Sequence, residues 1–166
     1  HPGADDDRWL YLPGLDLIKR ISAGDKRTSF VGSDFFYEDI SGRDVNADDF
    51  SILKEDDKTW TLKALPKYPN KVEFEHYTVT ISKENYLPLV SDYYDSAGKH
   101  YRRLSASKIK MVEGVATITE MKAENIISGS FTINQLRHVQ YNIDIPSNVF
   151  SERSLRMPPR KWLSGK

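Results

Sequence analysis

The sequence predicts a mainly β protein built around one large, curved antiparallel sheet. Apolar and polar residues alternate along many short runs, which is typical of strands with one buried face. Turn residues such as Pro13-Gly14 and Ser96-Ala97-Gly98 separate these runs. Because the connections are short, consecutive strands are expected to pair as neighbours in an up-and-down meander.

About nine strands are expected along the chain. The first two flank Pro13-Gly14 as a hairpin, and Gly114 and Gly129 mark later turns. The predicted strands are residues 8–12, 16–22, 50–54, 59–65, 77–82, 89–95, 100–112, 115–125 and 128–142.

A helix start interrupts the strands at residues 29–40. Ser33 or Asp34 is expected to cap this helix, with Glu38 and Asp39 in its first turn. The segment also has an apolar load too large to leave in water, formed by Phe30, Phe35, Phe36 and Tyr37. We therefore expect a short aromatic helix that covers one face of the sheet.

The C-terminal part is expected to contain a second short helix at residues 146–152, with Ser147 as its cap, followed by a loose tail at residues 157–166. With 166 residues the chain is long enough to bury its own core, so residues 1–166 are expected to form a single domain.

Composition excludes several classes of function. The 24 basic and 24 acidic residues balance, so no global field favours nucleic acid or an anionic membrane. Cysteine is absent, which excludes disulfides, thiol catalysis and cysteine metal sites. No apolar run approaches the ~20 residues of a membrane-spanning helix.

Residue types that carry catalysis or bind metals are present but scattered. Asp5-Asp6-Asp7 lacks the glycine and distal glutamate of a calcium loop. Asp34, Glu38 and Asp39 could pair as acid and base, but capping explains them without chemistry. The histidines fall on different runs without ligand-like spacing: His1, His76, His100 and His138. We therefore expect a non-catalytic protein without metal or cofactor.

Basic side chains gather in two places. Alternation divides the first group between both faces of one strand, so it does not form one groove for RNA and is expected to be a solvated outer strand. The second group is also expected to be solvated, with contact to an anionic surface left open. The groups are Lys99, Arg102, Arg103, Lys108 and Lys110, and Arg153, Arg156, Arg160 and Lys161.

Four blocks together resemble the outer-membrane lipoprotein-sorting protein family, the LolA-like group related in fold to LolA, LolB and RseB. The most specific block is residues 29–39 (SFVGSDFFYED). The others are residues 9–13 (WLYLP), 86–89 (YLPL) and 145–153 (IPSNVFSER).

This resemblance implies an incomplete, half-open antiparallel β-barrel whose concave face is covered by one or two short helices. It further implies a periplasmic carrier or chaperone without covalent chemistry, whose apolar cavity receives lipoprotein acyl chains or another lipid. An inner-membrane transporter is an implied partner. The chain is similar to the C-terminal two-thirds of the family domain, with the signal peptide and the N-terminal part outside it.

Lipid binding by such a protein would come from apolar burial, at ~0.8 kcal/mol per CH₂. Alternate residues of a strand point to the same face, and one such set is expected to line the cavity. The set is Trp9, Tyr11, Trp60, Leu62, Val79, Ile81, Leu89, Tyr93, Phe131 and Ile133. The expected lid is Phe30, Val31, Phe35 and Phe36. The opposite parity offers the alternative set Leu10, Leu12, Ile118 and Leu136. A third interpretation is that the first set simply forms a filled core.

A second function class stays open at this point, a periplasmic interaction or sensor module that binds a partner through a sheet edge or the tail. The missing N-terminal strands would leave the strand at residues 8–12 unpaired on one side. Such an edge is expected to favour pairing between copies of the chain.

Overall fold

The structure is a computed structural model that describes residues 8–163. These residues form two compact units. The larger unit is Arg27–Val139, and the smaller one combines the described residues up to Lys26 with those from Gln140 onward. The interpretation of residues 1–166 as one domain stays a prediction. The expectations for His1 and for residues 5–7 lie outside the described part.

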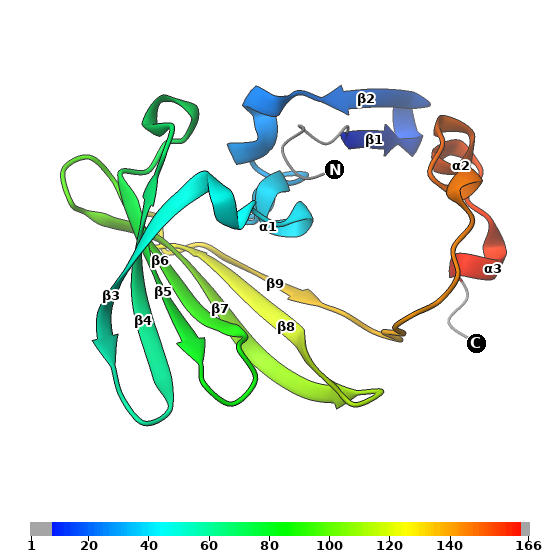
Figure 1. Ribbon diagram of the computed structural model, residues 1–166. Coiled ribbons are helices and arrows are strands. Elements are labelled where there is room, and N and C mark those ends of the chain that lie inside the picture. Colours follow the sequence, from blue (N-terminus) through cyan, green and yellow to red (C-terminus); the bar gives the residue numbers. More distant parts are fainter. Residues whose placement is uncertain (1–7, 164–166) are drawn as a thin grey trace. The chain divides into compact units, whose positions relative to one another are not determined.

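All nine predicted strands occur among residues 8–163, and each pairs antiparallel within its sheet with its neighbours in the sequence (Figure 1). The larger unit holds a seven-stranded sheet in the order β3-β4-β5-β6-β7-β8-β9. Its strands are β3 (Asp48–Glu55), β4 (Thr59–Pro66), β5 (His76–Ser82), β6 (Pro88–Tyr94), β7 (His100–Val112), β8 (Val115–Asn125) and β9 (Phe131–Gln135). The sheet does not close, since β3 and β9 are its edges. The predicted half-open antiparallel barrel is confirmed.

The last strand is shorter than predicted. It was expected at residues 128–142 but spans only Phe131–Gln135. The Asn125 side-chain oxygen accepts two backbone N–H groups of the turn that precedes it, and Gly129 has a φ of 76°. Beyond β9 the backbone of His138 has a φ of 55°, which ends extended structure.

Helix α1 (Tyr37–Ser41) lies in the predicted aromatic segment, but its predicted cap is wrong. The helix begins after Phe36, whose N–H donates to the Asp39 carboxylate at 2.6 Å. Ser33 instead donates its hydroxyl to a carbonyl within the loop, and Asp34 contacts β9. The first turn does contain the two predicted acidic residues.

The smaller unit contains the predicted hairpin of β1 (Arg8–Leu12) and β2 (Leu17–Ile21) as a separate two-stranded sheet. It also contains α2 (Glu152–Arg156) and α3 (Arg160–Leu163). The helix predicted at residues 146–152 is only partly present: a 3-10 helix spans Ser147–Val149 after Pro146, so Ser147 is not its cap. The α-helix α2 begins after Ser151, whose hydroxyl accepts the Ser154 N–H. The tail at residues 157–166 was expected to be loose, but part of it is helical because α3 lies within it. Among the described residues, no helix is both long and apolar enough to cross a membrane.

One face of the seven-stranded sheet carries the core of the larger unit. We call it the inner face and define it by the cross-strand row Leu62, Val79, Ser91, Leu104 and Ala123. Most of this row is buried, together with Phe35 from the segment before α1. The opposite face bears the ion pairs Arg103–Asp92 and Lys108–Glu120. The opposite face is therefore charged, whereas the defining row of the inner face is mainly apolar.

Replacing Phe35 with Ala is expected to lower the free energy of unfolding by about 3–5 kcal/mol, because this side chain is 2% exposed. Phe131→Ala is the matched control: its ring is 57% exposed, so we expect a loss below about 1 kcal/mol. Urea unfolding followed by circular dichroism measures both. Equal losses in the two variants would contradict the assignment of the core.

Candidate functional site

The inner face forms a candidate binding surface made of aligned apolar rows. The row that defines the inner face extends to Ile52 on β3 and to Thr132 on β9. In the next row Trp60 of β4 pairs with Ile81 of β5, and Ala106 of β7 pairs with Met121 of β8. Apolar side chains therefore lie side by side across much of the sheet, and on β7 and β8 the small Ala106 and Ala123 alternate with Leu104 and Met121.

Five of the ten residues predicted to line a cavity lie together on this face: Trp60, Leu62, Val79, Ile81 and Tyr93. Val79 and Tyr93 are buried in the core, while Leu62 and Ile81 pack against it and stay partly exposed. Leu89 lies where β5 and β6 shift register. The role of these residues as a ligand lining stays a prediction.

The other four residues of that set lie elsewhere. Phe131 pairs with Glu124 and Ile133 with Lys122, on the face opposite the core, so grouping them with Val79 was wrong. On β9 it is Thr132, the partner of Ala123, that lies on the inner face, so its neighbours Phe131 and Ile133 point to the other face. Trp9 and Tyr11 lie on β1 in the smaller unit. Ile118 of the alternative set pairs with Ile109 and also lies opposite the core.

The predicted lid lies over one end of the inner face. We call residues 29–41 the aromatic cover. Phe35 is buried in the core cluster, Phe30 packs against that cluster, and Val31 is exposed. Val31 and Gly32 have φ values of 52° and 77°, which reverse the chain in a tight turn. The left-handed conformation is unusual for a β-branched residue such as valine. That this segment opens as a lid stays a prediction.

Polar contacts attach the aromatic cover to edge strand β9. The Asp34 N–H donates to the Thr132 hydroxyl at 3.0 Å. The Asp34 carboxylate accepts hydrogen bonds from Thr132 at 2.8 Å and from Ser130 at 2.6 Å. This aspartate is a clamp between the cover and the sheet, not a helix cap.

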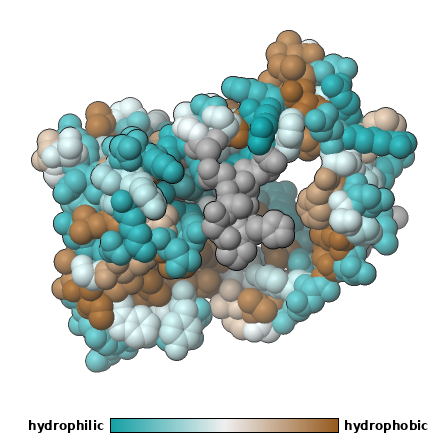
Figure 2. All heavy atoms as spheres, turned by 45° about the horizontal axis from the view of Figure 1, so that its top comes forward, coloured by the Kyte–Doolittle hydropathy of each residue, from teal (hydrophilic) through white to brown (hydrophobic). Residues whose placement is uncertain are grey.

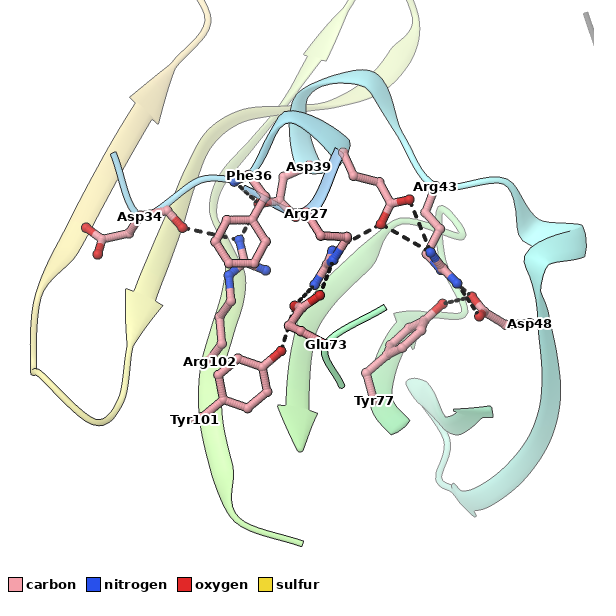
Figure 3. A network of polar contacts seen from close by, with 11 residues as sticks. Arg27, Asp34, Phe36, Asp39, Arg43, Asp48, Glu73, Tyr77, Tyr101 and Arg102 are labelled. Carbon is pink, nitrogen blue, oxygen red and sulfur yellow. Dashed lines mark hydrogen bonds and ion pairs between the residues drawn. The ribbon is translucent and has the colours of Figure 1, made fainter. Parts of the chain in front are cut away.

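A buried arginine attaches the other part of the cover to the sheet (Figure 3). Arg102 of β7 is 3% exposed and pairs through Nη2 with the Asp39 carboxylate. The same nitrogen donates to the Asp34 carbonyl at 3.3 Å. The guanidinium carbon lies 4.1 Å from the centre of the Phe36 ring. Arg102 thus contacts the cover through charge, hydrogen bond and cation–π stacking together.

Arg27 lies among the aromatic rings below α1. It pairs with Glu38 at 3.1 Å and forms a two-pronged contact with Glu73. Its guanidinium also stacks on Phe36, Phe74 and Tyr93 at about 5 Å. Burial alone would lower the pKa of Arg27, but the Glu73 carboxylate outweighs it and raises that pKa above its ordinary value. Arg27 therefore stays charged inside the cluster.

Arg43 extends the network to β3. It pairs with Glu38 at 3.1 Å and with both oxygens of Asp48 at 2.7 Å. The Tyr77 hydroxyl donates to the same Asp48 carboxylate at 3.0 Å. Burial and this carboxylate raise the pKa of Tyr77. The buried carboxylates of this network are thus satisfied by arginine and tyrosine.

This network was missed at the level of sequence. Arg102 was assigned to a solvated strand and Glu38 to capping, yet both are buried in ion pairs. One available signal was parity, since Arg102 shares its strand face with the apolar Leu104. Among residues 8–163, no three His, Asp or Glu side chains form a group that could hold a metal ion.

Comparisons with known proteins identify the family. A protein family described as an uncharacterized protein matches residues 1–157. Among solved structures, a DUF1329 family protein from Desulfovibrio piger is 30% identical, with a TM-score of 0.83 over 92% of this chain and 66% of that one. A domain described as an outer membrane lipoprotein-sorting protein domain, from Vibrio parahaemolyticus, is 28% identical, with a TM-score of 0.80 over 92% and 67% of the two chains.

A more distant structure shares the fold. A LolA superfamily protein from Nitrosomonas europaea has a TM-score of 0.61 at 18% identity, over 90% of this chain and 68% of that one. A search of curated proteins finds no match. This chain spans about two thirds of the length of these solved structures. The chain belongs to the LolA-like family, as the sequence motifs predict.

The Glu73 carboxylate gives a pH-dependent prediction. Burial would raise its pKa, but hydrogen bonds and charge from Arg27 outweigh burial and lower it below 4.5. A lowered pKa means that Glu73 contributes its full stabilisation above pH 4.5 and loses it as the pH falls through the folded-state value. Because the carboxylate is a third exposed, we expect Glu73→Gln to cost about 1–2 kcal/mol at pH 7.

Urea unfolding at pH 7 and at pH 3.5 tests this. The difference between the wild-type protein and Glu73→Gln should shrink at the lower pH. The exposed Glu84→Gln variant is the control and should match the wild-type protein at both values. A wild-type advantage over Glu73→Gln of the same size at both pH values would contradict the prediction.

Proposed function

We propose that this protein is a non-catalytic carrier that binds a lipidated or hydrophobic ligand on its inner face. The observation that supports this most directly is the row from Ile52 to Ala123, which crosses six strands of an open sheet and is apolar at every position except Ser91. Affinity for an acyl chain grows with apolar contact, at ~0.8 kcal/mol per buried CH₂, and needs few polar groups. A long apolar surface with a polar border suits such a ligand.

The part of this face near β3 to β5 gives the ligand its first contacts. Leu62 and Ile81 adjoin the buried cluster but are only partly buried. On β3, Phe50 is 40% exposed and Ile52 63% exposed. Figure 2 shows a band of hydrophobic side chains at the lower left, on the side where Figure 1 places β3 and β4. An acyl chain bound here would extend the core by covering these side chains.

The aromatic cover is the proposed lid of this site. Phe35 occupies apolar space at one end of the inner face, so an acyl chain that enters this end replaces it. The attachments of the cover, Asp34 to β9 and Asp39 to Arg102, are polar contacts that water can satisfy after opening. A lid held in this way opens without a permanent loss of hydrogen bonds.

Family membership supports the choice of cargo. The Vibrio parahaemolyticus domain is described as belonging to an outer membrane lipoprotein-sorting protein. We therefore propose lipoprotein acyl chains, or another lipid, as the ligand of this chain, the periplasm as its location, and an inner-membrane transporter as a partner.

A second candidate function is an interaction module that binds a protein partner through edge strand β3. Seven of the eight residues of β3 are exposed, among them Phe50, Ile52 and Leu53. An unpaired edge with apolar side chains can accept a strand of another chain. In that case the inner face would not need to bind lipid.

Substituting Ile81 separates these functions. Ile81→Ser removes an apolar contact of the inner face and is expected to weaken binding of a palmitoylated peptide about tenfold or more. Ile133→Ser is the matched control on the opposite face and should bind like the wild-type protein. Displacement of the fluorescent probe N-phenyl-1-naphthylamine measures both affinities. Absence of saturable binding, or equal loss in both variants, would contradict the carrier proposal.

A disulfide between the cover and the sheet tests the lid. The side chains of Asp34 and Thr132 lie 2.8 Å apart at their oxygens, and the chain has no cysteine of its own. In the Asp34→Cys/Thr132→Cys double variant, we expect oxidation to reduce affinity for the palmitoylated peptide at least tenfold and reduction to restore it. The same protein in its two redox states is its own control. Equal affinity in both states would show that the cover does not move on binding.

A further inference from the structure

We infer that Arg102 binds a neutral carbonyl oxygen of the cargo, so that the preferred ligand is an acyl chain in ester or amide linkage. This inference rests on the proposed carrier function and names the polar group that the ligand carries. Its basis is the unusual state of the Arg102 side chain. The residue is 3% exposed, and its Nε and Nη1 atoms have no hydrogen-bond partner among the described residues.

Unpaired N–H groups on a buried charged side chain are costly, and most proteins avoid them. The neighbouring network shows what a satisfied arginine looks like. Arg27 donates from Nε to Glu73 at 2.9 Å, and Arg43 donates from Nε to Asp48 at 2.7 Å. Arg102 uses only Nη2, towards Asp39 and the Asp34 carbonyl. Its Nε and Nη1 donors are unused but buried, so an acceptor reaches them when the proposed lid opens.

Arg102 lies where an acyl chain on the inner face would end. Along β7 its side chain shares a face with Leu104 and Ala106, and Ala123 of β8 pairs with Leu104. At ~3.3 Å per residue, the strand places Arg102 about 13 Å from Ala106. Along this track Ala106 and Ala123 are small, and Leu104 and Met121 supply the larger apolar contacts for a hydrocarbon chain. A ligand lying on it brings its linkage oxygen to the guanidinium.

The charge balance of the network favours a neutral oxygen over an anion. Three arginines face four carboxylates in it: Arg27, Arg43 and Arg102, and Glu38, Asp39, Asp48 and Glu73. A ligand carboxylate would add to the excess of negative charge and compete with Asp39 for Arg102. An ester or amide carbonyl accepts an N–H without adding charge. Hydrocarbon offers no acceptor at all.

The test compares four ligands with the same ten-carbon chain: N-methyldecanamide, methyl decanoate, decanoate and decane. Each displaces N-phenyl-1-naphthylamine from the full chain. We expect the amide and the ester to bind about tenfold or more tightly than decane and more tightly than decanoate. In Arg102→Met this preference should disappear, while Arg103→Met, which alters the neighbouring residue on the opposite face, should keep it.

A measurement on the unmodified protein covers the case in which Arg102→Met does not fold. The arginine Nε–H resonances are followed by ¹⁵N–¹H spectroscopy during titration. N-methyldecanamide should move the Arg102 signal towards a hydrogen-bonded position, and decane should not. The Nε–H signals of Arg27 and Arg43 already have carboxylate acceptors and should stay in place.

The outcomes separate this inference from the function on which it rests. If none of the four ligands displaces the probe, the carrier proposal fails and the inference fails with it. If all four bind equally and the Arg102 signal does not move, the inference is overturned while the carrier proposal stands. Tightest binding by decanoate would also overturn it, because the site would then select an anion.

Discussion

The contact between Asp39 and Arg102 fixes the aromatic cover on the sheet. Asp39 has two roles, because its carboxylate accepts the Phe36 N–H at the start of α1 and also pairs with Arg102 on β7. One side chain thus determines where the helix begins and where it rests. Losing one partner of a buried pair costs about 3–5 kcal/mol, since the other charge stays buried without compensation. Helix start and cover position therefore depend on the same carboxylate.

The core of the larger unit is apolar in one region and ionic in the next. Phe35, Ala64 and Val79 form its apolar part, whereas Arg27 lies between the rings of Phe36 and Phe74. Aromatic rings suit both regions, because their edges pack on aliphatic side chains and their faces attract cations. This explains why a segment so rich in phenylalanine also contains Glu38 and Asp39. The rings contact the arginines, and these two carboxylates neutralise them.

Alternation in the sequence was sufficient to predict every strand and the pairing of neighbours. It located the helix within a few residues and placed Leu62, Val79 and Tyr93 on one face. It failed where local hydrogen bonds decide the geometry. The Asn125 turn precedes β9, and the pairing of Thr132 with Ala123 places Phe131 on the other face.

The ionic part of the site could not be predicted from local patterns. Asp39 and Arg102 are 63 residues apart, and Arg27 and Glu73 are 46 apart. Only the folded sheet brings them together, so no spacing rule connects them. Parity offered a partial signal, because Arg102 alternates in phase with Leu104 and was therefore a candidate for burial. No comparable pattern in the sequence identified Asp39 as the carboxylate that pairs with Arg102.

The combination of apolar and ionic contacts has a consequence for the proposed carrier function, in which cargo is taken up and released. An acyl chain that displaces Phe35 exchanges one apolar burial for another, so this exchange contributes little net free energy. The ion pairs and hydrogen bonds of the cover favour the closed state, and they are recovered when the ligand leaves. Net affinity is then the difference between the contacts of the cargo and those of the cover. In the proposed carrier, the attachments of the lid through Asp34 and Asp39 would keep that difference small enough for transfer to an acceptor, which a permanently open apolar surface of the same area would not allow.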